Sequence, residues 1–416
     1  MFDAARQGRQ GSSSARAYDC ETVTSFAVAQ RCARVGVTRL VLTDFRNYRS
    51  VRLDLDTGPV VLTGPNGAGK TNLLEAVSFL SPGRGLRNAR LGELDRRSTD
   101  EPALWAVAAT VETCRGPVRI GTGRDAGVGS QSPSLSRGER RVVRVDGQPA
   151  RGQTTLAEKL AILWLTPQMD RIFIEGPSGR RRLLDRLVLA LDPAHAGRVA
   201  SYEQAMRERA RLLREGPNDP AWLAALEEVM AEKGVAVAAA RRDTVERLDR
   251  ACAEADGAFP RARLSLDGTV EDWLATEPAL AAEDRFKAVL AESRSADALT
   301  GGAAVGPHRC DLAVAHAEKG MPADSASTGE QKALLIAIVL AHARLLCEIR
   351  GEPPILLLDE VAAHLDEIRR GALFEALSGL ASQSWITGTD AALFAPLRAA
   401  GRFLSVHDGA VSETDL

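Results

Sequence analysis

The eight residues GPNGAGKT, from Gly64 to Thr71, constrain the fold more than any other stretch of the chain. They follow the apolar run VVLT and precede a helical pattern, so the glycines fall in a tight turn between a strand and a helix. Such a turn directs several backbone N–H groups at one point, where the helix dipole favours an anion. The pattern predicts a parallel α/β sheet with a phosphate-binding loop at the end of one strand.

The residue types in this loop predict what it binds. We expect the loop backbone to hold the phosphates of ATP, Lys70 to neutralise the β- and γ-phosphates, and the hydroxyl of Thr71 to bind Mg²⁺. ATP and Mg²⁺ are therefore the expected ligands. The backbone cradle consists of Gly64, Pro65, Asn66, Gly67, Ala68 and Gly69.

A second apolar run, Ile355–Leu358, ends in two acidic residues. A short run of this kind is typical of a buried parallel strand, and the residues that follow it lie at the carboxyl edge of the sheet. There Asp359 is expected to bind Mg²⁺, directly or through water, and Glu360 to polarise the attacking water. Lys70 and Glu360 are thus candidate catalytic residues.

The stretch SASTGEQK, residues 325 to 332, leads into another helical pattern and has the features of a second anion-binding helix start. Ser327 can cap this helix, and Gly329 allows a ligand to approach the backbone. One chain therefore carries two predicted phosphate sites far apart in sequence.

The series STGEQK, ILLLDE and HLD resembles the signature, Walker B and D-loop of ABC-type ATPases. The resemblance implies an ATP-dependent homodimer, in which the signature of one subunit closes over the ATP held by the partner's loop. It implies that Ser327 contacts the γ-phosphate during catalysis, that Gly329 is the signature glycine and that Asp366 lies at the dimer seam. Thr389 stands where a transporter ATPase has a histidine.

Three further residues are candidates for nucleotide contact. Arg46 and Asn47, in the stretch FRNY, occupy the place where related ATPase heads touch the nucleotide. Gln168, in TPQMD, suits a residue that senses Mg²⁺ and nucleotide between two lobes, although a plain turn residue after a strand is an equally good interpretation.

From about residue 37 onward, roughly nine-tenths of the chain resembles the RecF family within the ABC class. The stretches that carry the resemblance are LTDFRNYRSVRLDL, EGPSGRRRLLDR and GPHRCDL, in which Cys310 replaces an expected acidic residue. The resemblance implies a Rad50-like head that binds DNA at single-strand/duplex junctions or gaps. It also implies cooperation with RecR and RecO in loading RecA during recombinational repair, and weak ATPase activity coupled to DNA binding and dimerisation.

The predicted fold is therefore a P-loop, ABC-type α/β ATPase head with an inserted helical arm. Residues 1–36 are polar and weakly periodic, which is typical of a disordered extension. Residues 37–165 are expected to form the first half of the ATPase lobe. Residues 166–299 should form a helical lobe with a hairpin broken at REGPNDP, where Gly216 and Pro217 end one helix and Asp219 and Pro220 cap and start the next. Residues 300–416 should hold the signature helix, Walker B, D-loop and remaining ATPase strands.

Charge gives a local rather than a global indication of DNA binding. The chain has 53 basic and 55 acidic residues, but residues 115–151 hold eight arginines and three acids. This run is the best candidate for phosphate contact. In GRRRLLDR, helical spacing would instead let Arg181 and Arg182 pair with Asp185, which favours a structural role.

The sequence predicts a cytoplasmic protein with reduced thiols. Its six cysteines are scattered, it has no apolar run long enough to span a membrane, and it has no signal peptide.

Two other functions compete with a RecF-like role. A transporter's ATP-binding subunit would need a histidine near Thr389 and no inserted arm, and a long-armed SMC or Rad50 structural protein would need hundreds of heptad residues.

Overall fold

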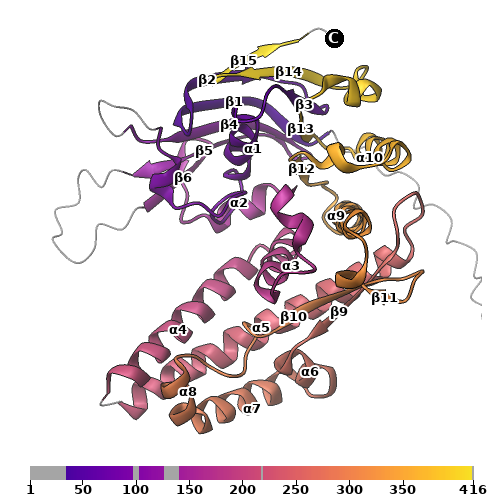
Figure 1. Cartoon of the computed structure of the whole chain (residues 1–416). Helices are drawn as coiled ribbons and strands as arrows, with labels where there is room; N and C mark the ends of the chain where they lie inside the picture. Colours follow the sequence, from indigo (N-terminus) through magenta and orange to yellow (C-terminus); the bar gives the residue numbers. More distant parts are fainter. Residues whose placement is uncertain (1–33, 97–102, 126–139, 217–218, 415–416) are drawn as a thin grey trace, which may run out of the picture. The chain divides into compact units, whose positions relative to one another are not determined.

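The computed structural model describes residues 34–96, 103–125, 140–216 and 219–414 (Figure 1). The expected N-terminal extension therefore lies outside the described residues except for its last three. Of these, Val35 is 2% exposed and bridges to Ser382, and Gly36 begins the first strand. The fold of the described part rests on three β-sheets and the helices that pack on them.

The central sheet is mostly parallel and places the predicted strands next to one another, in the order β15-β14-β3-β13-β12-β8. Neighbours from β14 to β8 are parallel, and β15 is antiparallel to β14. Both faces are buried, because alternate residues of β3 and β12 enter two different cores. Its strands are β3 (Val60–Thr63), β8 (Ile162–Leu165), β12 (Ile355–Leu358), β13 (Ser384–Gly388), β14 (Arg402–His407) and β15 (Ala410–Glu413).

A second, antiparallel sheet has the order β2-β1-β4-β5-β6-β7. Buried apolar residues alternate along its longer strands, and they share one core with helix α1 (Lys70–Ser78) and one face of the central sheet. The strands are β1 (Gly36–Phe45), β2 (Tyr48–Asp54), β4 (Ala106–Thr113), β5 (Gly116–Asp125), β6 (Arg140–Val145) and β7 (Gln148–Pro149). The Gly/Ser-rich loop expected between β5 and β6 lies outside the described residues.

The other face of the central sheet is covered by a second core, to which α3, α9 and α10 contribute. Helix α9 supplies the most residues because it is apolar nearly all round, as expected of a helix buried between layers. The helices are α2 (Thr154–Lys159), α3 (Pro177–Leu191), α9 (Thr328–Arg350) and α10 (Glu367–Gly379). Short 3₁₀ turns lie at Leu91–Leu94, Pro167–Arg171, Ala323–Ser325, Val361–His364 and Ala391–Leu397.

The predicted helical hairpin consists of α4 (His195–Glu215) and α5 (Pro220–Ala253), which lie side by side (Figure 1). The 34 residues of α5 span about 51 Å. Asp219 caps α5 by accepting hydrogen bonds from the N–H groups of Ala221 and Trp222, and Pro220 occupies the first turn, as expected.

A third core holds this hairpin together with α6 (Thr269–Thr276) and α7 (Ala279–Glu292), beside which α8 (Arg294–Thr300) packs on α4. A small sheet in the order β11-β10-β9 joins β9 (Ala262–Asp267) to β10 (Asp311–His316) and β11 (Met321–Pro322). This sheet straddles the expected division at residue 300, since β9 precedes it and β10 follows it.

Two observations bear on the predicted compartment. None of the helices in the described part of the chain is long and apolar enough to cross a membrane. Cys252, Cys310 and Cys347 are free thiols, as expected.

Candidate nucleotide-binding site

Two glycines of the loop have a backbone conformation and surroundings that only glycine fits. Gly64 has a φ of +143°, and a Cβ there would lie 2.2 Å from a carbonyl oxygen of β14. Gly69 has a φ of +119°, and its Cβ would lie 2.6 Å from Asn47 Nδ2 and 2.6 Å from the Tyr48 hydroxyl. The loop is thus locked between β14 and the turn that follows β1.

Lys70 is the first residue of α1 and is 5% exposed. Its Nζ donates hydrogen bonds to the carbonyl oxygens of Gly64 at 2.8 Å and Pro65 at 2.9 Å. Burial lowers the pKa of Lys70, and the nearby carboxylates of Glu360 and Asp359 act in the opposite direction. The ammonium is therefore held across the loop, where it can neutralise a phosphate.

Strand order brings the Walker B acid to the loop, because β13 alone separates β3 from β12 in the described sheet. Thr71 Oγ1 donates to Asp359 Oδ1 at 3.0 Å, and Thr387 Oγ1, from β13, donates to the same oxygen at 2.8 Å. Burial raises the pKa of Asp359, whereas the two hydroxyl hydrogen bonds lower it. Thr71 and Asp359 are thus adjacent oxygen donors, which is the ligand type that Mg²⁺ prefers.

Thr387 also fixes the backbone of Glu360, which sequence reasoning did not foresee. The Glu360 N–H donates to Thr387 Oγ1 at 2.8 Å, and Glu360 has a φ of +53°, a left-handed conformation that is uncommon for a glutamate. Thr387 is fully buried. One hydroxyl therefore joins the predicted metal ligand to the predicted catalytic base.

Asn47 lies against the nucleotide loop, and Arg46 lies against the helix α1 that follows it. Asn47 Nδ2 donates to the Ala68 carbonyl at 3.2 Å, and the guanidinium of Arg46 binds both oxygens of Glu75, at 2.8 and 2.9 Å. Glu75 is a fully buried residue of α1 and also pairs with Arg87. These contacts fix α1 and the loop, and they leave direct nucleotide contact by Arg46 and Asn47 as a prediction.

Gln168 follows β8 at the same edge of the central sheet and has an exposed side chain. Two residues further on, Asp170 pairs with Lys332 of α9 at 3.4 Å. The turn that carries Gln168 is therefore tied to the signature helix, a link suited to a sensor between lobes, and a nucleotide or Mg²⁺ contact for Gln168 stays a prediction.

Ser327 caps α9 as predicted, with Glu330 as its reciprocal partner. The Glu330 N–H donates to Ser327 Oγ at 3.4 Å, and the Ser327 N–H donates to Glu330 Oε2 at 3.0 Å. An ion pair with Lys319 and these hydrogen bonds lower the pKa of Glu330 to about 2. Ser327 and Gly329 are exposed, and a Cβ at Gly329 would meet nothing within 4 Å.

Asp366 is an exposed cap of α10 that accepts a hydrogen bond from the Arg369 N–H at 2.8 Å. Thr389 is exposed just beyond β13. Among the described residues, no hydrogen bond or ion pair joins Ser327, Gly329 or Asp366 to the Lys70 site. The structure thus brings together the loop, Asp359 and Glu360, and leaves the signature and D-loop residues facing solvent.

The described arginines of the run from 115 to 151 lie in different environments, and Arg124, for example, is partly buried in an ion pair with Asp95. Arg140 and Arg144 are exposed, but Arg141 is 7% exposed and donates to the carbonyl oxygens of Phe79, Ser81 and Gly83. These carbonyls lie just after α1, where a helix leaves acceptors unpaired. Our interpretation of the whole run as phosphate contacts is therefore wrong for Arg141, and its residues 126–139 lie outside the described part of the chain.

The run GRRRLLDR has the structural role that we favoured, but with other partners. Asp185 binds Arg241 of α5 at 2.9 Å and His195 at 2.8 Å, rather than Arg181 or Arg182. Arg181 donates instead to the Cys310 carbonyl at 2.8 Å. These contacts join α3 to α5 and to the stretch GPHRCDL.

Comparisons with known proteins agree on one family. Residues 36–410 match the family model described as the RecF/RecN/SMC N terminal domain. The chain is 49% identical over 380 residues to the DNA replication and repair protein RecF of Rhizobium etli (strain CIAT 652), which covers 91% of this chain and 99% of that protein. It is 49% identical over 387 residues to RecF of Mesorhizobium japonicum, with 92% and 99% covered.

Solved structures share the fold. A structure of the recombination mediator protein RecF with ATP matches 92% of this chain and 98% of that one, with a TM-score of 0.78 and 24% identity. An Smc head domain from Pyrococcus furiosus matches 92% of this chain and 96% of that one, with a TM-score of 0.50 and 18% identity. Because the family model spans residues 36–410 and relatives at 49% identity match more than nine-tenths of the sequence, the chain belongs to the RecF family.

Proposed function

We propose that this protein is an ATP-hydrolysing DNA-repair protein that dimerises on ATP and binds gapped or junction DNA. The observation that carries the proposal is the cluster of Lys70, Thr71, Asp359 and Glu360 at one edge of the central sheet. In it, Lys70 would neutralise phosphate charge, Thr71 and Asp359 would hold Mg²⁺, and Glu360 would accept a proton from the attacking water. Bound Mg²⁺ would supply a positive charge that stabilises the transferring phosphoryl group.

The separation of the two predicted phosphate sites supports dimerisation. Ser327 and Gly329 present an open helix start, and their hydrogen bonds in the described part of the chain do not reach the Lys70 loop. A phosphate site left open on one subunit suits the nucleotide of a second copy. We therefore assign Ser327, Gly329 and Asp366 to the closure of a homodimer around two ATP molecules.

DNA, RecR and RecO as partners, and assistance to RecA loading, rest on the family. Relatives that are 49% identical to this chain are DNA replication and repair proteins, and one protein of similar solved structure is a recombination mediator of the RecFOR pathway. The arm also favours this function over a long-armed structural ATPase, because α5 has only 34 residues. Exposed arginines such as Arg140 and Arg144 are available for DNA phosphates.

The test is a fluorescence anisotropy titration of the full-length protein with gapped, duplex and single-stranded DNA, with and without ATP. We expect ATP to raise the affinity for gapped or junction DNA by tenfold or more, about 1.4 kcal/mol. Lys70→Met, which removes the charge in the loop, should abolish this gain. Equal binding with and without ATP would contradict the proposal.

Thr387 is expected to be a positioning residue for hydrolysis. Thr387→Val keeps the size of the side chain but removes the hydroxyl that links Asp359 to the Glu360 backbone. We expect kcat to fall about tenfold or more, as for loss of a buried hydrogen-bond link of about 1–3 kcal/mol. The affinity for ATP should change little, because the Lys70 hydrogen bonds remain. Thr387→Ser, which keeps the hydroxyl, should restore kcat, and wild-type turnover in Thr387→Val would rule out this role.

A further inference from the structure

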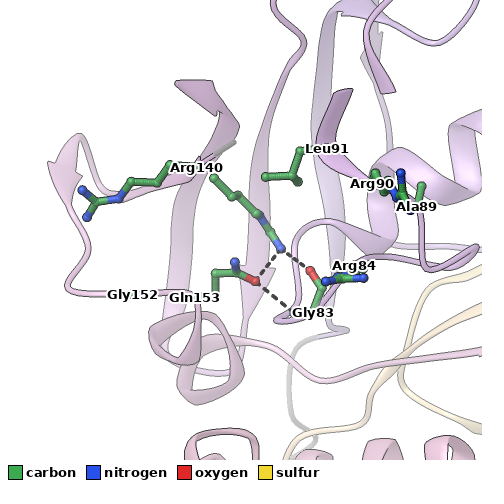
Figure 2. Close-up of a pocket in the computed structure, with 9 residues that line it drawn as sticks. Gly83, Arg84, Ala89, Arg90, Leu91, Arg140, Gly152 and Gln153 are labelled. Carbon is green, nitrogen blue, oxygen red and sulfur yellow. Dashed lines mark hydrogen bonds between the residues drawn. The ribbon is translucent and has the colours of Figure 1, made fainter. Parts of the chain in front are cut away.

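A hollow of about 630 Å³ lies beside the start of β6 (Figure 2), and no residue of the nucleotide loop lines it. Four of its lining residues are Arg84, Arg90, Arg140 and Arg141, and no acidic residue lines it among the described residues. Figure 2 shows Arg84 and Arg90 on one side and Arg140 on the other, turned outward, with Gln153 and Gly83 between them. The hollow is thus lined by cations from two segments of the chain, residues 84–90 and residues 140–141.

The base of the hollow is fixed by Arg141. Its Nε donates to Thr122 Oγ1 at 2.8 Å, and its Nη1 donates to the Gly83 carbonyl at 2.9 Å and to Gln153 Oε1 at 3.2 Å. Gln153 Oε1 also accepts from the Gly83 N–H at 3.1 Å. The amide oxygen of Gln153 therefore faces Gly83 and Arg141, and the N–H donors of the same amide point away from them. A rigid base reduces the entropy cost of binding a ligand.

The charge of this hollow is not balanced from within the described part of the chain. Arg141 is buried but has hydrogen bonds only to neutral groups, and the end of α1 supplies only about half a negative charge to it. Arg84, Arg90 and Arg140 take part in no ion pair with any described residue. Glu93, in the neighbouring turn, accepts the backbone N–H of Arg90 at 2.9 Å and does not line the hollow. Arg84, Arg90 and Arg140 are exposed, and positive charges gathered without an acidic residue in the lining attract anions, so an anion is the expected complement.

We infer that this hollow is a phosphate-binding site, distinct from the nucleotide loop, in which Arg84 and Arg90 contact the anion above the base formed by Arg141 and Gln153. Guanidinium groups bind phosphate oxygens in pairs and are weakly hydrated, which suits this ligand. The phosphate could come from a DNA backbone or from a free nucleotide or inorganic phosphate. The DNA source rests on the proposed function, whereas the free-phosphate source does not.

The test compares two double variants of the full-length protein that remove the same amount of charge. Arg84→Ala with Arg90→Ala removes the two proposed phosphate ligands. Arg214→Ala with Arg398→Ala, at exposed positions with no described ion pair and outside the lining of the hollow, is the matched control. Both pairs are surface positions, and thermal melting checks that they fold.

In the first arm, duplex DNA is titrated at several salt concentrations. If the site takes DNA phosphates, the slope of log K against log salt becomes shallower by about 0.9 for each phosphate that is no longer bound, in the first pair only. In the second arm, the thermal stability of the protein is measured as potassium phosphate is added at constant ionic strength. All proteins in this arm also carry Lys70→Met, so that the nucleotide loop contributes little to phosphate binding.

The second arm assigns the site to free phosphate under two conditions. Phosphate must stabilise the Lys70→Met protein against thermal unfolding. This stabilisation must disappear when Arg84→Ala and Arg90→Ala are added to Lys70→Met, and it must persist when the control pair is added instead. If neither measurement separates the two pairs, the inference is wrong. A wild-type protein that binds no DNA would overturn the proposed function, while the second arm would still decide on the hollow.

Discussion

Glu360→Gln is expected to slow ATP hydrolysis by about 10²- to 10⁴-fold, the usual contribution of a general base. The amide cannot accept a proton from water, but it keeps the size of the side chain and the backbone hydrogen bond to Thr387 Oγ1. Lys70, Thr71 and Asp359 are unchanged, so ATP should still bind. With hydrolysis blocked, the ATP-bound homodimer should accumulate.

Two measurements check this expectation. A steady-state ATPase assay gives the decrease in turnover, and size-exclusion chromatography with ATP gives the fraction of dimer. Glu375→Gln, the same change at an exposed position of α10, is the matched control and should behave as wild type. Glu360→Gln protein that elutes only as monomer with ATP would contradict ATP-driven dimerisation, and wild-type turnover would remove Glu360 from catalysis.

Features set by local sequence could be predicted. The phosphate-loop turn, the buried strand before Asp359 and the cap at Ser327 each depend on a few adjacent residues whose chemistry allows one local structure. The Asp219 and Pro220 start of α5 is of the same kind. Local patterns place each of these features at the residue where the structure has it.

Features set by strand order and by alternation could not be predicted in the same way. Thr387 reaches Asp359 only because β13 lies between β3 and β12, which no local pattern reveals. Arg141 is buried because β6 directs alternate residues inward, so adjacent arginines have opposite environments. Asp185 binds Arg241, which lies 56 residues away in sequence, in place of the helical neighbours that spacing suggested.

Ser327→Arg is expected to abolish cooperative ATP hydrolysis while leaving ATP binding intact. The substitution puts a long cation at the exposed start of α9, where the signature would close over the partner's γ-phosphate. It leaves the subunit's own Lys70 hydrogen bonds untouched. Ser327→Ala, which removes the cap at a cost of about 1 kcal/mol but adds no bulk, separates weakening of the helix from blocked closure. We expect Ser327→Ala to keep more ATPase activity and more dimer than Ser327→Arg.

Mixing Ser327→Arg with Lys70→Met should then restore part of the activity, because a mixed dimer joins the intact loop of the first to the intact signature of the second. Random pairing of equal amounts makes half of the dimers mixed, each with one complete site, so roughly a quarter of the wild-type sites return. Recovery below this value would mean that both sites must close together, and recovery must vanish when each variant is assayed alone. If Ser327→Arg protein fails to bind ATP as a monomer, the signature acts on its own chain's nucleotide, and the arrangement of a site shared between subunits is wrong.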